Sequence, residues 1–146
     1  MPAADRRPTR DNLGFELAKA SQRWNELLSE EFSEHGFPEV RPAYGSVLLP
    51  LFEEDGLRMG QIAERSRLAK QTMTTLVRLT ERDELVRRER DPGDARAQLV
   101  RLTARSREFV PVAATVVADL DSRVLARLGQ RRYRFLRNGL TEVMSL

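Results

Sequence analysis

The sequence predicts a mainly α-helical fold with one small β-hairpin. Apolar residues recur every three or four positions over most of the 146 residues, which is the pattern of helices with one buried face. Residues 85–90 and 97–102 alternate instead, on either side of the hexapeptide DPGDAR. Its Pro and Gly are typical of a tight turn between two strands. A chain of this length is expected to form a single domain with its own core.

The first predicted helix spans residues 12–32, with Asp11 as its expected N-cap. Its apolar stripe consists of Leu13, Leu17, Ala20, Trp24, Leu27, Leu28 and Phe32. Residues 1–10 contain no apolar core, so they are predicted to be a disordered leader and not a signal peptide.

Five further elements are expected before the hairpin. Residues 43–53 form a second helix, which Pro50 is expected to kink or to end early because it removes a backbone hydrogen bond. A short strand (57–59), a short helix (60–66), a turn (67–68) and a helix (70–82) follow.

The helix over residues 70–82 has two chemically different faces. Its inner face carries Met73, Leu76, Val77 and Thr80, whereas its outer face carries Gln71, Thr74, Thr75, Arg78 and Arg82. Gln, Thr and Arg can contact base edges in the major groove of DNA, which admits one α-helix. A helix-turn-helix with such an outer face is typical of a DNA recognition helix. Lys70, Gln71 and Thr72 begin this helix, so their free N–H groups are expected near a phosphate.

Two long helices are expected after the hairpin. Thr103 is the expected N-cap of a helix over residues 104–128, in which Pro111 predicts a bend or a later start. Gly129 ends that helix, and residues 130–144 form the last one. Their apolar stripes exceed what one small DNA-binding unit needs, and two such units on a twofold axis would contact half-sites about one helical turn apart. We therefore expect a homodimer on a pseudo-palindromic operator in double-stranded DNA.

Positive charge is concentrated in the middle of the chain, although the net charge is only +3. Residues 1–56 carry 6 basic and 11 acidic side chains, residues 57–110 carry 13 and 8, and residues 111–146 carry 6 and 3. A basic central region is expected if this part meets a phosphate backbone. A solvated helical face is the alternative explanation for the same excess.

The stretch LRMGQIAERSRLAKQTMTTLVRLTERDELVRRERDPGDARAQLVRLT, residues 57–103, resembles the MarR family of winged helix-turn-helix transcription regulators. Its D-x-R-x-x-x-V-x-L-T element is complete over residues 94–103. The resemblance implies a winged helix-turn-helix flanked by N- and C-terminal dimerisation helices. Residues 11–146 would be a single MarR-like domain, in which 41–103 bind DNA and 11–40 and 104–146 form the dimerisation helices.

The resemblance also implies roles for individual residues in the hairpin, which is termed the wing in winged helix-turn-helix proteins. Arg96 would enter the minor groove, where a narrow A·T-rich stretch attracts a guanidinium group. Asp94 would pair with Arg88 on the neighbouring strand, unless Asp94 and Gly93 serve only to form the turn. The expected DNA-binding residues are Lys70, Gln71, Thr72, Thr74, Thr75, Arg78, Arg88, Asp94 and Arg96.

Four positions depart from the family pattern. Ala69 stands where a Ser or Thr usually caps the recognition helix, which costs about 1 kcal/mol of helix stability. Thr80 replaces a usually apolar residue, and Glu84 and Ser106 replace frequent glycines.

Many family members are repressors that a small, often aromatic or phenolic, anion releases from DNA. Here the expected effector-binding residues are Arg23, Trp24, Arg41, Tyr44 and Phe52, for which ordinary core or surface roles are the alternative. The competing interpretation of the whole chain is an architectural or protein-partner-controlled DNA-binding module without a small-molecule effector.

An enzyme is not expected, because the sequence has no nucleophile elbow, no P-loop and only one histidine. The absence of cysteine excludes disulfides, thiolate metal sites and a thiol-based peroxide sensor. No cofactor is expected. No apolar run is long enough to span a membrane, and a cytoplasmic location is expected.

Overall fold

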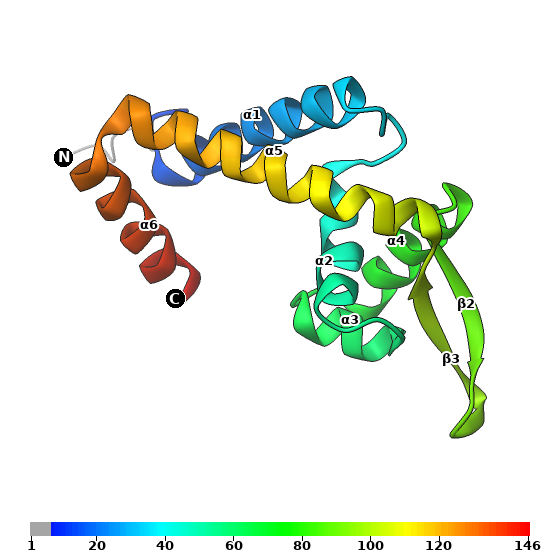
Figure 1. The fold of residues 1–146 in the computed structure, drawn as a ribbon. Coiled ribbons are helices and arrows are strands. Elements are labelled where there is room, and N and C mark those ends of the chain that lie inside the picture. Colours follow the sequence, from blue (N-terminus) through cyan, green and yellow to red (C-terminus); the bar gives the residue numbers. More distant parts are fainter. Residues whose placement is uncertain (1–6) are drawn as a thin grey trace. The chain divides into compact units, whose positions relative to one another are not determined.

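A computed structural model describes residues 7–146, so residues 1–6 of the predicted leader lie outside the described part. The described chain forms six α-helices, one 3-10 helix and three strands (Figure 1). Its contacts group it into two compact units, one ending at Pro42 and the other spanning Ala43–Leu146. The helical fold with one hairpin that the sequence predicts is confirmed.

The first unit contains helix α1, Leu13–Glu34. Its N-cap is Asn12 and not Asp11, because the Asn12 side chain accepts a hydrogen bond of 2.9 Å from the Phe15 N–H. Burial of the predicted apolar stripe is greatest at the C-terminal end of the helix. Leu13 is exposed, Trp24 is half-buried and Phe32 is buried.

The 3-10 helix η1, Pro42–Tyr44, lies at the boundary of the two units, and helix α2, Gly45–Glu53, follows it in the second unit. Helix α2 does not stop early at Pro50. In a regular helix the N–H of residue 50 would donate to the carbonyl of Ser46, and Pro50 has no N–H. The Ser66 hydroxyl donates to that carbonyl instead, so a side chain from the next helix supplies the missing donor.

The short strand β1, Leu57–Arg58, comes next in the chain. Helices α3, Met59–Arg65, and α4, Lys70–Arg82, follow it and form the helix-turn-helix. The three helices α2, α3 and α4 pack on one another. Their core consists of side chains with 6% or less of their surface exposed: Val47, Leu48, Leu51, Ile62, Ala63, Met73 and Val77. The helix predicted over residues 70–82 is therefore confirmed, and its bounds match.

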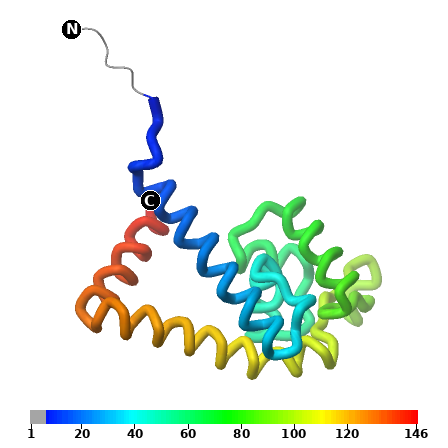
Figure 2. Tube along the Cα trace, turned by 90° about the horizontal axis from the view of Figure 1, so that it is seen from above, coloured from blue at the N-terminus to red at the C-terminus, as the bar shows by residue number. Residues whose placement is uncertain are grey.

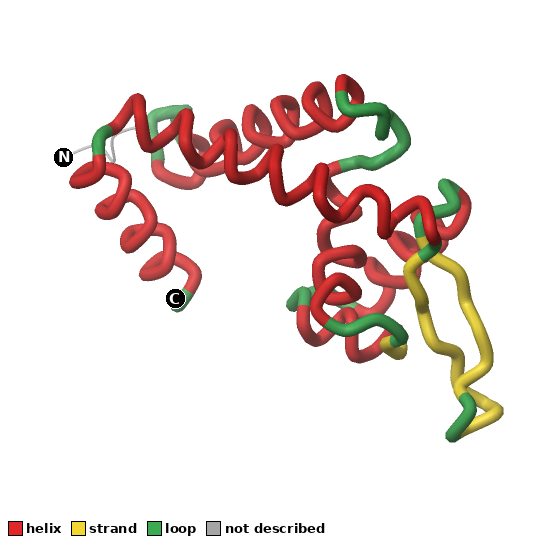
Figure 3. The backbone as a smooth tube through the Cα atoms, in the orientation of Figure 1, coloured by secondary structure: helices red, strands yellow, loops and turns green. Residues whose placement is uncertain are grey.

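Strands β2, Val86–Asp91, and β3, Asp94–Leu102, form the wing, drawn in yellow in Figure 3. The three-stranded antiparallel sheet has the order β1-β3-β2. Val86 lies opposite Leu102 at the base, and Asp91 lies opposite Asp94 beside the turn. Both strands reach closer to Pro92–Gly93 than the sequence predicts, because pairing continues until these two turn residues.

Glu84, just before the wing, has a positive φ of 60°. Left-handed backbone is unfavourable for residues with a Cβ and favours glycine. This conformation explains why a glycine is frequent here among the proteins that the sequence resembles.

Helix α5, Ala104–Leu128, begins directly after Thr103, whose hydroxyl accepts from the Ser106 N–H at 3.3 Å. The helix continues through Pro111, so the expected later start is wrong. At Gly129, with a φ of 79°, the chain turns into α6, Gln130–Met144 (Figure 2). No helix formed by residues 7–146 is both long and apolar enough to cross a membrane.

Candidate DNA-binding surface

Helix α4 separates its two faces as the sequence predicts. Met73, Val77 and Thr80 have no exposed surface. The outer side chains are all exposed: Gln71, Thr74, Thr75, Arg78 and Arg82. Leu76 alone of the predicted inner face is half-buried.

The buried Thr80 is satisfied within its own helix. Its hydroxyl lies 3.0 Å from the Leu76 carbonyl and 2.9 Å from the Val77 carbonyl, so it can donate to either one. A buried hydroxyl with a partner avoids the desolvation cost of an unpaired polar group. Thr80 therefore fills an apolar position without a large penalty.

The exposed threonines of α4 use their hydroxyl hydrogens inside the helix. Thr74 donates to the Lys70 carbonyl at 2.9 Å, with Met59 Sδ as a second acceptor at 3.2 Å, and Thr75 donates to the Gln71 carbonyl at 3.3 Å. Each side chain is left with hydroxyl lone pairs and a methyl group. Such a surface can accept from base amino groups and can contact the methyl group of thymine.

The first turn of α4 lacks a side-chain cap. Its N-cap is Ala69, which supplies no side-chain hydrogen bond. The backbone N–H groups of Lys70, Gln71 and Thr72 make no hydrogen bond among the described residues. Exposed N–H groups at a helix N-terminus attract an anion, and Lys70 adds a positive charge beside them.

Arg96 lies at the exposed tip of the wing, with 93% of its side chain accessible. Asp94 accepts from the Arg96 backbone N–H at 3.0 Å and lies 3.4 Å from its Nε. Asp94 thus shapes the turn that presents Arg96.

The expected pair between Asp94 and Arg88 is not formed. Arg88 lies opposite Val100, six residues along β3 from Asp94, which corresponds to about 20 Å of strand. Its Nε lies 3.4 Å from a carboxylate oxygen of Glu81 on α4. The pairing suggested by resemblance is therefore wrong for this chain, because the strand register separates the two residues.

Asp91 makes an ion pair that connects the wing to β1. The Nε and Nη2 of Arg58 donate to Asp91 Oδ2 at 3.0 Å and 2.7 Å. Asp91 Oδ1 accepts from the Gly93 N–H at 2.8 Å. The Gly93 bond and the Arg58 guanidinium lower the pKa of Asp91 below its usual value, although its burial opposes this.

Sequence reasoning missed Arg58, because it precedes the helix-turn-helix on a strand of two residues. The order Asp-Pro-Gly could have predicted the role of Asp91 in the turn, since an Asp side chain often accepts a hydrogen bond from the backbone N–H two residues later.

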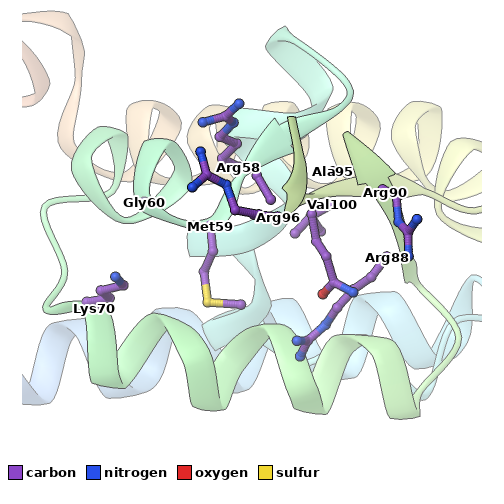
Figure 4. Close-up of a pocket in the computed structure, with 11 residues that line it drawn as sticks. Arg58, Met59, Gly60, Lys70, Arg88, Arg90, Ala95, Arg96 and Val100 are labelled. Atoms are coloured by element: carbon purple, nitrogen blue, oxygen red, sulfur yellow. The ribbon is translucent and has the colours of Figure 1, made fainter. Parts of the chain in front are cut away.

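A basic cavity of about 500 Å³ lies between the start of α4 and the wing (Figure 4). Five basic side chains and no acidic side chain are among its lining residues. The basic ones are Arg58, Lys70, Arg88, Arg90 and Arg96. Three of these were expected from the sequence, and Arg58 and Arg90 were not.

The five expected effector-binding residues divide between the two units. Arg23, Trp24 and Arg41 belong to the first, and Arg23 pairs with Glu26 at 3.1 Å. In the second unit Phe52 is half-buried, and the buried Tyr44 donates its hydroxyl to Asp83, the C-cap of α4.

Comparisons with known proteins agree with this architecture. The MarR family model matches residues 42–97, from η1 to the wing. The transcriptional regulator HosA of Escherichia coli O111:H- is 27% identical over 121 residues, which cover 81% of this chain and 90% of HosA.

Solved structures share the fold over nearly the whole chain. The MepR–DNA complex of S. aureus matches with a TM-score of 0.78 at 19% identity, covering 92% of this chain and 97% of MepR. PcaV of Streptomyces coelicolor, solved with its natural ligand, matches with a TM-score of 0.76 at 23% identity, covering 99% and 98%.

Proposed function

The chain belongs to the MarR family of transcription regulators, and on that premise we propose that it is a homodimeric repressor of a specific operator. A small ligand releases it from the DNA. The family consists of DNA-binding regulators and not of enzymes. The observation that carries the proposal is the exposed outer face of α4, where Gln71 and Arg78 stand beside two threonines whose hydroxyl hydrogens are already used.

In the proposed complex α4 lies in the major groove and the wing lies beside the adjacent minor groove. Gln71 and Arg78 can each form two hydrogen bonds to one base, which is the contact that best discriminates sequence. The accessible guanidinium of Arg96 would enter the minor groove. The MepR–DNA complex supports this arrangement, because MepR has the same fold and is bound to DNA.

Dimerisation is supported by an apolar surface on α6. None of its residues is buried, and Phe135, Leu136, Leu140 and Met144 are all between 37% and 69% exposed. A surface of this kind on a helix marks an interaction site. The expected measurement is a dimer mass by sedimentation equilibrium, and Leu136→Glu should shift it toward the monomer.

Release by a ligand is the finer part of the proposal. PcaV supports it, because that regulator binds a natural ligand on the same fold. In this chain Tyr44 could couple ligand binding to α4, since its hydroxyl contacts Asp83, the C-cap of that helix. A phenolic or carboxylate ligand that competes for this hydroxyl would disturb the end of α4. Titrating phenolic acids should weaken operator binding, and unchanged affinity throughout the series would contradict release.

Genomic fragments selected by the protein test the DNA-binding proposal directly. Footprinting should show a protected pseudo-palindrome, as expected for a regulator that acts on chromosomal DNA in the cytoplasm. Gln71→Ala and Arg78→Ala should each cost about 1–3 kcal/mol on this site and much less on random DNA. Lys19→Ala on exposed α1 is the control and should change neither. Uniform, salt-sensitive binding without a protected site would instead support an architectural role.

A further inference from the structure

We propose that the basic cavity between α4 and the wing binds a phosphate of the DNA backbone, at the point where the strand passes from the major to the minor groove. The lining residues of the cavity come from the N-terminal end of α4, from β1 and the start of α3, and from both strands of the wing (Figure 4). This inference rests on the proposed DNA-binding function. It assigns DNA contacts to Arg90 and Arg58, which neither the motif nor the recognition helix includes.

The charges around the cavity are only partly neutralised within the protein. Arg58, Arg88 and Arg96 each have a carboxylate within 3.4 Å. Lys70 and Arg90 have no ion pair among the described residues. The cavity therefore keeps unbalanced positive charge on two elements that face each other across it, at the start of α4 and on β2.

Donor groups in the cavity also remain available. Arg88 Nε is buried beside Glu81 and makes no hydrogen bond, so it is closed to a ligand, although the Arg88 side chain adds positive charge to the lining. Asp91 engages the Nε and Nη2 of Arg58, and the Nη1 of Arg58 makes no hydrogen bond among the described residues. Guanidinium N–H groups and an ammonium group are the donors that proteins use for phosphate.

The shape of the cavity suits a backbone phosphate. Small residues form part of its lining, namely Gly60, Ala95 and Ala97, so a bulky group can approach closely. A Cβ at Gly60 would meet nothing within 4 Å, which shows that space is open there. The volume of about 500 Å³ is large enough for a phosphodiester group with some of its hydration.

Position favours DNA over a small free anion. Lys70, at the start of α4, and Arg96, at the wing tip, both line the cavity. If α4 and the wing occupy neighbouring grooves, the strand that separates these grooves must cross between them. Its phosphates then meet the basic lining, whereas its bases meet Gln71 and Arg78.

The test uses the full-length protein and a salt titration on both operator and random duplexes. Arg90→Gln should weaken binding by the same factor on both, because phosphate contacts carry no sequence information. The slope of log K against log salt should fall by about one. The matched control is Arg87→Gln on the same strand, because Arg87 is exposed, pairs with Glu89 and does not line the cavity. Its slope should stay at the wild-type value.

A second measurement places the contact on the DNA. A duplex with a neutral methylphosphonate at the crossing position should lower the wild-type slope by about one, with little further change for Arg90→Gln. Thermal unfolding of Arg90→Gln should match the wild type, since the residue has no ion pair to lose.

Three results would overturn the inference. Equal salt slopes for Arg90→Gln and Arg87→Gln would show that Arg90 does not contact a phosphate. A loss of affinity for the operator alone would show that Arg90 contacts a base. If Arg90→Gln lost the ability to bind pyrophosphate but bound DNA as the wild type does, the cavity would be a site for a small anion. Failure of the inference stays distinct from failure of the proposed function: only in the second case does the wild-type protein protect no specific site.

Discussion

Arg58 and Asp91 are 33 positions apart in the sequence, yet two guanidinium nitrogens of Arg58 contact one carboxylate oxygen of Asp91 at 2.7 Å and 3.0 Å. The other carboxylate oxygen accepts from Gly93 at the turn. One side chain therefore fixes the turn and connects it to β1, beside the helix-turn-helix. The wing is long and exposed, so this connection limits the positions that Arg96 can occupy.

Titration of Asp91 should show this connection. Its lowered pKa means that its stabilising contacts are complete above the usual Asp range near 3.9 and are lost as the pH falls through the lower folded-state pKa. Arg58→Ala should raise the pKa of Asp91 only part of the way, because the Gly93 N–H is the larger cause and remains. An NMR titration that follows the side-chain carboxyl signal of Asp91 against pH measures this pKa in the wild type and in Arg58→Ala. An unmoved pKa would mean that the ion pair is absent in solution.

Glu84→Gly should stabilise the fold by about 0.5–1 kcal/mol. The substitution relieves a residue whose φ is 60°, and part of the gain is offset by the greater freedom of glycine in the unfolded chain. Urea denaturation measures the change. Glu84→Ala is the control, since it removes the same charge and keeps the Cβ. Equal effects of the two substitutions would assign the gain to charge instead of backbone strain.

Ser66→Ala should cost about 1–2 kcal/mol, because the Ser46 carbonyl loses the donor that replaces the N–H missing from Pro50. The cost should shrink in a Pro50→Ala background, where an N–H is restored to α2. A double-mutant cycle on the free energy of unfolding measures this coupling. Additive effects would contradict it.

Tyr44→Phe should destabilise the protein by about 1–2 kcal/mol, because its buried hydroxyl donates to the Asp83 carboxylate at the end of α4. Tyr133→Phe is the matched control. Tyr133 is half-buried, and its hydroxyl makes no hydrogen bond among the described residues. Thermal unfolding separates the two. Tyr44→Phe should also loosen the end of α4, which faster amide exchange at Glu81 and Arg82 would show.

Local pattern was sufficient for the helices and for the faces of α4. Buried positions recur at helical spacing, so the outer position of Gln71 and the inner position of Met73 follow from the sequence alone. The exact N-cap of α1 did not follow, since Asp11 and Asn12 are both good caps and only hydrogen-bond geometry distinguishes them. The continuation of α2 past Pro50 did not follow either, because it depends on a donor from another helix.

By itself, therefore, the sequence determined the order of the elements, the turn of the wing and the side of α4 that can face DNA. These depend on contacts within a few residues or on a single period. Only the tertiary structure decided that Asp91, and not Asp94, pairs with an arginine of another strand, and that Arg58 and Arg90 border one cavity with Lys70. Strand register and sheet order set which distant side chains meet, and a shift of one residue would exchange every partner.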